Sequence, residues 1–315
     1  MTQPRIDLPG ALLIDKPVGM TSHDVVDAVR RLYRTRAVGH CGTLDPAASG
    51  LLIILVRRAT KVAALFSEQD KTYRATLHLG ATSDTGDADG RITPGPEVPP
   101  LAQPEFESLL KRFQGDVTLA IPAYAAVRSG GRRRHELARR GLPVPEASRT
   151  VAIRNIDVLR YELPRIELRI DCSAGTYIRS LVEAIGDAVG CGAYLAGLRR
   201  ERSGLCRVED AFPLETLAER KSSEEGLPHP QPFERHLALP IIELSAARAF
   251  AVSQGQALRA EDIVSIEGQF ESGATVLLRP RGGRVVAVAE ARFSSATGPD
   301  AAQGGTPFRY RRVLI

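Results

Sequence analysis

The residues of this sequence with the clearest chemical potential surround Asp45, in the stretch VGHCGTLDPAASGLLIILV over residues 38–56. Small residues flank this carboxylate, Pro46 follows it, and an apolar run begins at Leu51. Such a loop lets a bulky substrate approach the carboxylate closely, and the apolar run predicts a buried strand that anchors the loop. An Asp-Pro pair is also common at turns and helix starts, with Asp as the cap. The loop alone therefore leaves two alternatives, a structural turn and a catalytic carboxylate.

Four further polar residues suggest a substrate for this carboxylate. His40 lies five residues before Asp45, and Tyr73 lies on an alternating strand. The segment CSAGTYIRSL places Tyr177 and Arg179 at a turn that enters a helix. An arginine favours the ionised carboxylate that a nucleophile needs, and a tyrosine stacks on a planar ring and handles a proton. Each residue alone also suits a structural role, but together they predict a site for a planar base.

Charge points weakly to a polyanionic partner. The formal net charge is +5 and the pI is near 9.2, with 37 arginines against 5 lysines. The segment RSGGRRRHELARRG has a single acidic residue, Glu136. One interpretation of this segment is a solvated helix. The other is a phosphate-binding element, because arginines this close repel each other unless they share an anion. Its arginines are Arg128, Arg132, Arg133, Arg134, Arg139 and Arg140.

The composition narrows the class of protein. A chain of 315 residues with 43% hydrophobic residues predicts a sizeable core and about two domains. No apolar run has the length of a signal peptide or a membrane span, so we expect a soluble, cytoplasmic protein. The four cysteines are scattered without a C-x-x-C pair, which argues against a disulfide framework or a zinc site. The acidic loop ATSDTGDADG has no closing glutamate and is not an EF-hand.

The periodicity predicts alternating strands and helices, hence an α/β (α+β) fold. Strands are expected over residues 10–15, 51–56, 71–80, 151–160 and 163–171, and helices over residues 21–33, 104–113 and 179–190. Residues 220–238 are polar and contain proline, which is typical of a linker. Residues 239–315 then predict a small β-rich module with strands over residues 275–280, 284–293 and 308–315 and one helix over residues 245–255.

Several motifs, in order, resemble those of the tRNA pseudouridine synthase B family. They are LLIDKPVGMTSHDVV, GHCGTLDPAASGLL, KTYRATLHLG, SDTGDADG, IPAYAAVR, CSAGTYIRSL and LRRERSG. The similarity covers roughly residues 10–215. It implies an enzyme that isomerises a uridine of RNA, usually at position 55 in the tRNA T-loop, by breaking the C–N glycosidic bond and forming a C–C bond. The family needs no cofactor or metal.

The resemblance also implies roles for individual residues. Asp45 matches the catalytic aspartate, Tyr73 the tyrosine that stacks on the base, and Arg179 the arginine that pairs with the aspartate. The resemblance does not decide which atom Asp45 attacks or deprotonates. Tyr177 and Leu198 match residues that line the pocket. His40 matches a histidine that fills the space left by the flipped nucleotide, and Lys16 and Lys61 match basic residues near the RNA.

The same family implies the architecture. A mixed, mostly antiparallel sheet with flanking helices would form a catalytic domain over residues 1–235. An insertion at about residues 123–150 would place Arg128, Arg132, Arg133, Arg139 and Arg140 on the T-loop backbone. Residues 236–315 would form a small RNA-binding β-barrel of the PUA type. We expect the tRNA T-arm as partner, no membrane, no obligate protein partner and a monomer.

Some residues depart from the family pattern, and two other classes of function stay open. Cys41, for example, replaces a common threonine, which affects expected RNA contacts rather than the reaction. An RNA chaperone without catalysis would use the same arginines. A glycosidase would need a second carboxylate about 5–10 Å from Asp45; the candidates are Asp84, Asp87 and Asp89.

Overall fold

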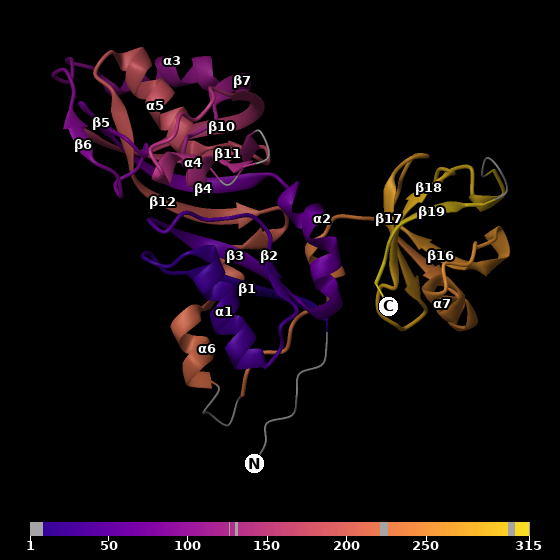
Figure 1. The fold of residues 1–315 in the computed structure, drawn as a ribbon. Coiled ribbons are helices and arrows are strands. Elements are labelled where there is room, and N and C mark those ends of the chain that lie inside the picture. The colour runs from indigo at the N-terminus through magenta and orange to yellow at the C-terminus, as the bar shows by residue number, and fades with distance from the viewer. Residues whose placement is uncertain (1–8, 126, 130–131, 221–225, 302–305, 315) are drawn as a thin grey trace.

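A ten-stranded mixed sheet organises most of the chain in the computed structural model (Figure 1). The structure describes residues 9–125, 127–129, 132–220, 226–301 and 306–314. Only the β1–β14 and β3–β12 pairs are parallel, so the predicted mostly antiparallel sheet is confirmed. In spatial order the strands are β14 (Phe212–Pro213), β1 (Gly10–Lys16), β3 (Ala48–Val56), β12 (Ala193–Ser203), β4 (Lys71–Leu79), β11 (Arg165–Cys172), β10 (Ser148–Glu162) and β7 (Gly115–Ala120), with β2 (Val38–His40) beside β3 and β13 (Cys206–Arg207) beside β12.

Helices cover this sheet, and two short hairpins form separate two-stranded sheets. Helix α1 begins after Thr21, whose side chain and Asp24 form a capping box. Helix α5 ends at Gly190 in the left-handed conformation, as predicted. The helices are α1 (Ser22–Tyr33), α2 (Ala63–Ser67), α3 (Gln103–Leu110), α4 (Arg134–Arg139), α5 (Ile178–Val189) and α6 (Leu214–Arg220), and the hairpins are β5 (Ala81–Ser83) with β6 (Ile92–Pro94) and β8 (Arg128–Ser129) with β9 (Arg132–Arg133).

The apolar run after Asp45 forms β3, which is buried on both faces. Leu52 and Ile54 pack with α1, whereas Leu51 and Ile53 pack on the other face with Phe66 of α2. A strand buried on both faces needs a continuous apolar run rather than an alternating one. The continuous apolar run LLIILV therefore explains why the strand that follows the Asp45 loop is buried on both faces.

A second sheet follows in the C-terminal part of the chain. Its strands lie in the order β16 (Ile263–Glu267), β15 (Ile241–Leu244), β17 (Thr275–Pro280), β18 (Ala287–Ala291) and β19 (Phe308–Val313), with α7 (Ala246–Ser253) packed nearby. Strands β15 and β16 were not predicted. A closed barrel was expected, but the sheet is open, since β16 and β19 do not pair within the described residues.

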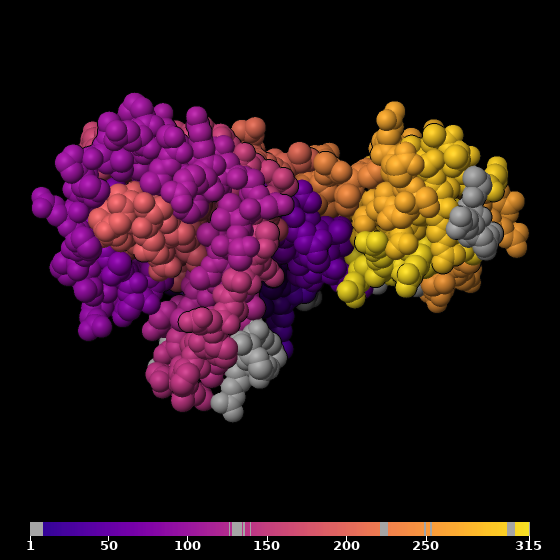
Figure 2. Space-filling view, turned by 90° about the horizontal axis from the view of Figure 1, so that it is seen from above, coloured from indigo at the N-terminus to yellow at the C-terminus, as the bar shows by residue number. Residues whose placement is uncertain are grey.

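The two sheets are joined by a shared core. Leu277, Val288 and Leu314 of the C-terminal part cluster with Leu51 and Ile53 of β3. Lys61 donates to the carbonyl of Val313 at 3.2 Å, and Arg284 donates to that of Pro9 at 2.8 Å. In Figures 1 and 2 the C-terminal sheet lies beside the larger unit. The division at residues 235 and 236 stays a prediction.

The prediction of a linker over residues 220–238 is wrong for its second half. Gln231 pairs with Ala11 through both backbone hydrogen bonds. Phe233 and Leu237 are each only 5% exposed and belong to the shared core. The linker was predicted from the prolines, which indicate an irregular backbone. An irregular backbone can still bury its apolar side chains. In the described part of the chain, no helix is long and apolar enough to cross a membrane.

Candidate active site

The Asp45 loop is fixed by hydrogen bonds at both ends. Ser22, only 2% exposed, accepts from the Leu44 amide at 2.8 Å and donates to the Leu44 carbonyl at 3.1 Å. The carbonyl of Asp45 accepts from the Ala48 amide at 3.0 Å, which closes a turn. Gly50 has φ +101°, and a Cβ there would lie 2.4 Å from the Arg200 carbonyl oxygen. Only glycine therefore lets β3 approach β12 this closely.

Asp45 is paired with Arg179. The Nε atom of Arg179 lies 3.2 Å from Oδ2 of Asp45, and its Nη1 lies 3.6 Å from Oδ2 of Asp87. Arg179 also donates to the carbonyls of Thr85 at 2.8 Å and Tyr124 at 3.2 Å. The Arg179 side chain is 5% exposed and the Asp45 side chain 37%. The arginine is thus immobilised by four groups, and the aspartate keeps one open side.

Burial raises the pKa of Asp45, and the nearby carboxylates of Asp87 and Asp89 raise it further. The positive charges of Arg179 and Lys16 act in the opposite direction. Arg179 therefore favours the ionised carboxylate as expected, but it does not fully offset the burial. This carboxylate is more basic than an exposed aspartate.

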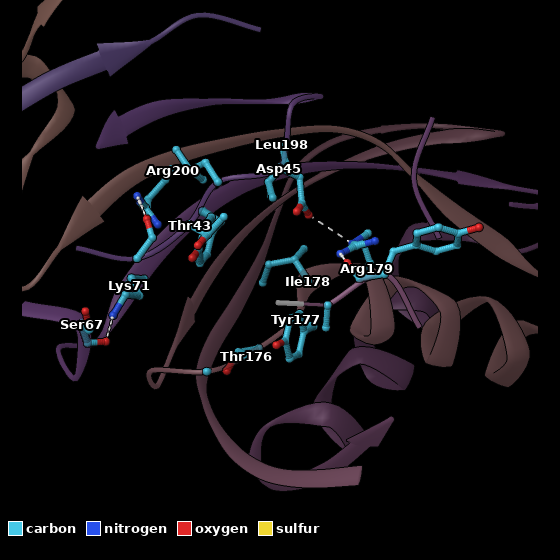
Figure 3. A pocket seen from close by; sticks show the side chains of 16 residues that line it. Thr43, Asp45, Ser67, Lys71, Thr176, Tyr177, Ile178, Arg179, Leu198 and Arg200 are labelled. Carbon is cyan, nitrogen blue, oxygen red and sulfur yellow. Dashed lines mark hydrogen bonds and ion pairs between the residues drawn. The ribbon is translucent and has the colours of Figure 1, made fainter. Parts of the chain in front are cut away.

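A pocket of about 230 Å³ opens beside Asp45 (Figure 3). It brings together five of the residues singled out in the sequence, from four distant segments: Asp45, Tyr73, Tyr177, Arg179 and Leu198. Tyr73 lies on β4, Tyr177 directly precedes α5, and Leu198 lies on β12. An aromatic ring, an apolar side chain and a carboxylate at one small pocket suit a planar ring joined to a reactive carbon.

Sequence reasoning missed two basic residues of this pocket, Lys71 and Arg200. Both had been quoted within motifs without a role. Tyr124 and Ala125, at the base of the predicted insertion, also line the pocket. No local signal identifies Arg200, because it lies between Arg199 and Glu201 in the sequence although its side chain is only 1% exposed.

Comparisons with known proteins agree with this geometry. Residues 30–178 match the family model described as TruB family pseudouridylate synthase (N terminal domain). The chain is 41% identical over 268 residues to tRNA pseudouridine synthase B of Heliobacterium modesticaldum, covering 84% of this chain and 87% of that one. It is 38% identical over 290 residues to the Mycobacterium tuberculosis protein of the same name, covering 90% and 96%. This chain belongs to the tRNA pseudouridine synthase B family.

Solved structures support the pseudouridine synthase fold. A crystal structure of the archaeal box H/ACA sRNP Nop10–Cbf5 complex matches with a TM-score of 0.73 and 26% identity, over 100% of this chain and 93% of that one. A Cbf5–Nop10–Gar1 complex matches with a TM-score of 0.74 and 27% identity, over 100% and 91%. The enzyme is thus a pseudouridine synthase that acts on tRNA.

Three of the residues predicted to belong to the site, Lys16, His40 and Lys61, do not line the pocket. Lys16 is fully buried and donates to the carbonyls of Pro17 at 2.8 Å and Met20 at 2.6 Å. Burial lowers the pKa of Lys16 to about 8. His40 has a buried Nδ1 without a partner among the described residues, and burial lowers its pKa. Lys61 instead contacts the C-terminal sheet through Val313.

The arginine-rich insertion is only partly described. In Figure 2 the segment around α4 projects from the larger unit. Arg140 is exposed, whereas Arg134 is buried and donates to the carbonyls of Ile121, Pro122 and Pro145, so it stabilises the base of the insertion. The side chains of Arg128, Arg132, Arg133 and Arg139 lie outside the described residues.

The geometry disfavours a glycosidase. Asp87 and Asp45 both form ion pairs with Arg179. Its carboxylate accepts from the Thr85 hydroxyl at 2.6 Å and the Asp89 amide at 3.2 Å, and its side chain is 8% exposed. A second catalytic carboxyl group must reach the leaving group or a water molecule. Asp87 is instead occupied in holding Arg179.

Replacing Cys41 with threonine should leave turnover within about 3-fold and lower the melting temperature. Cys41 is 1% exposed, and burial raises the pKa of its thiol to about 12. It lies in the apolar cluster with Cys206, where a hydroxyl without a partner costs about 1–3 kcal/mol. Single-turnover kinetics and thermal unfolding of Cys41→Thr check both parts. A loss of turnover comparable to that of an Asp45 variant would show that the thiol takes part in the reaction.

Proposed function

We propose that the enzyme converts uridine 55 in the T-loop of tRNA to pseudouridine, with Asp45 as the essential carboxylate. The observation that supports this most directly is the Asp45–Arg179 pair at a pocket that also holds Tyr73 and Leu198. The glycosidic bond of a stacked base is out of reach of a side chain, so the nucleotide must flip into the pocket. Contacts to the RNA backbone offset the few kcal/mol that flipping costs.

Each pocket residue has a proposed role. Tyr73 stacks on the uracil and assists removal of the C5 proton. Arg179 orients Asp45 toward the sugar and base. Tyr177 and Leu198 hold the ring edge, and His40 fills the space that the flipped nucleotide leaves. We expect the enzyme to act in the cytoplasm as a monomer, without cofactor, metal or obligate protein partner.

The experiment that tests this function is modification of an unmodified tRNA transcript by the purified enzyme. Pseudouridine is mapped by carbodiimide labelling and primer extension. We expect one stop, at the T-loop uridine, and none in a transcript with cytidine at that position. No stop in either transcript, despite measurable binding, would favour a chaperone or a different RNA substrate.

RNA binding should depend steeply on salt. The predicted backbone contacts are Arg128, Arg132, Arg133, Arg139 and Arg140. If about four phosphates are neutralised, the Kd should rise on the order of 100-fold between about 50 and 200 mM salt. Arg140→Met should reduce the slope of log Kd against log salt by about 1. An affinity that is flat over this range would refute an electrostatic interface.

A further inference from the structure

The two ends of the pocket differ in their electrostatics. Figure 3 shows Asp45 and Arg179 at one end and Arg200 and Lys71 at the other. At the first end the arginine faces two carboxylates. At the second end the basic side chains donate to backbone carbonyls, and the proposed function assigns them no role.

Arg200 is held by uncharged acceptors. Its Nε donates to the Leu51 carbonyl at 2.7 Å and its Nη2 to the Gly42 carbonyl at 3.1 Å. Its positive charge also acts on Tyr73, the proposed stacking residue, and lowers the pKa of that phenol against the effect of burial. With 1% exposure, its charge is not screened by solvent.

Lys71 is similar. Its Nζ donates to the carbonyls of Ser67, at 2.7 Å, and Gln69, which leaves one of its three protons. The side chain is buried, and burial together with Arg200 lowers the pKa of Lys71 to about 8. The amine therefore remains mostly protonated at neutral pH. Asp70, its neighbour in sequence, pairs with Arg154 at 3.3 Å instead.

Other arginines of β12 have acidic partners. Arg199 pairs with Asp15 at 2.7 Å and Arg202 with Asp171 at 3.0 Å. Among the residues that the structure describes, neither Arg200 nor Lys71 has a carboxylate within ion-pair distance. A buried cation without a counter-ion is costly, so such a pair is most useful where an anion is bound or formed.

We propose that Lys71 and Arg200 form a cationic wall that stabilises the negative charge developing on the uracil ring during isomerisation. This rests on the proposed function. When the N1–C1′ bond breaks, its electron pair stays on N1 and spreads to O2 and O4. C5 then bonds to C1′, the C5 proton leaves, and N1 gains a proton, so atoms and charge balance. Lys71 contacts a ring oxygen, and Arg200 is a positioning residue that acts through Tyr73.

A phosphate of the RNA backbone is the other anion that such a wall would attract. Lys71 and Arg200 line the pocket but are only 5% and 1% exposed, so little of either side chain is open to a phosphate at the protein surface. The part of the nucleotide that enters deepest is its base. The geometry therefore favours the ring over the phosphate.

The test compares two T-arm hairpins, with uridine or 5-fluorouridine at the target position. Fluorine withdraws electrons and stabilises the ring anion, so the fluorinated substrate depends less on the wall. We expect Lys71→Met to lower the single-turnover conversion of uridine about 100-fold with Kd nearly unchanged. In 5-fluorouridine C5 has no proton to release, so the rate compared is that of exchanging the N1–C1′ bond for the C5–C1′ bond, after which water adds at C6. We expect this rate to fall less than about 10-fold. The control Arg74→Met removes the same charge from the same strand; its side chain is 44% exposed and lies outside the pocket, so both rates should hold within about 2-fold.

The ratio of the two rates is taken within one protein, so a partly misfolded variant does not distort it. Lys71→Gln serves as a second variant. Equal losses on both substrates would overturn the proposal, as would a weakened Kd with unchanged rates, which would assign the wall to a phosphate. If the unsubstituted enzyme converts neither hairpin, the proposed function itself fails, and the wall with it.

Discussion

Asp45→Asn should lower the single-turnover rate of pseudouridine formation on the order of 10⁴-fold while leaving the Kd for the T-arm nearly unchanged. The amide keeps the shape of the carboxylate and one acceptor for Arg179, but it loses the negative charge that the chemistry requires. Quench-flow assays and a binding titration at the same salt concentration measure the two quantities.

The same variant should melt at a higher temperature than the unsubstituted enzyme at neutral pH. Because the pKa of Asp45 in the folded state is raised above its ordinary value of 3.8, the fold favours the neutral carboxyl group. Ionisation therefore destabilises the fold once the pH exceeds the folded pKa. The difference in melting temperature should shrink as the pH falls toward 3.8 and vanish below it.

A carboxylate of similar exposure provides the control for both parts. Asp70, 41% exposed and paired with Arg154, lies outside the pocket, so Asp70→Asn should change the rate less than about 2-fold and should not stabilise the fold. If Asp45→Asn retained more than a tenth of the activity, Asp45 would not be the essential group. A lower melting temperature at neutral pH would contradict the pKa argument.

Arg179→Gln should have the second largest effect, on both stability and the pH dependence of the reaction. It leaves Asp87, 8% exposed, without its cation and frees the carbonyls of Thr85 and Tyr124. Breaking such a buried pair costs about 3–5 kcal/mol of unfolding free energy. Because the positive charge lowers the pKa of Asp45, its loss should shift the acid limb of the pH–rate profile to higher pH.

Chemical denaturation and a pH–rate profile check these effects. The matched control is Arg199→Gln, since Arg199 binds Asp15 through two hydrogen bonds but is 39% exposed and lies outside the pocket. We expect it to cost less than about 1 kcal/mol and to leave the pH profile in place. An unshifted acid limb in Arg179→Gln would mean that another group controls that limb.

The sequence alone predicted the elements better than the contacts between them. The burial of β3 and the caps of α1 and α5 follow from local patterns. Asp45 and Arg179, by contrast, meet only because α5 packs against the sheet, and family resemblance rather than spacing paired them. Contacts between distant segments depend on how the whole sheet assembles, which a local pattern does not contain.

The missed residues have physical explanations as well. Strand β12 pairs with β4 through two irregularities, one between Leu195 and Gly197 and one between Arg200 and Arg202. Each changes which side chains face the pocket, so simple alternation fails. A charged residue is also expected at the surface, so nothing in the local sequence marks Lys71 and Arg200 as buried.

The core shared by the two sheets bears on how this protein can be divided. Leu277, Val288 and Leu314 belong to the same apolar cluster as Leu51 and Ile53 of β3, the strand that follows the Asp45 loop. A catalytic unit cut at residue 235 would therefore lose part of the apolar cluster that also contains these two side chains of β3. Another RNA-binding domain could therefore replace the C-terminal sheet only if it also supplied the apolar side chains that complete this cluster.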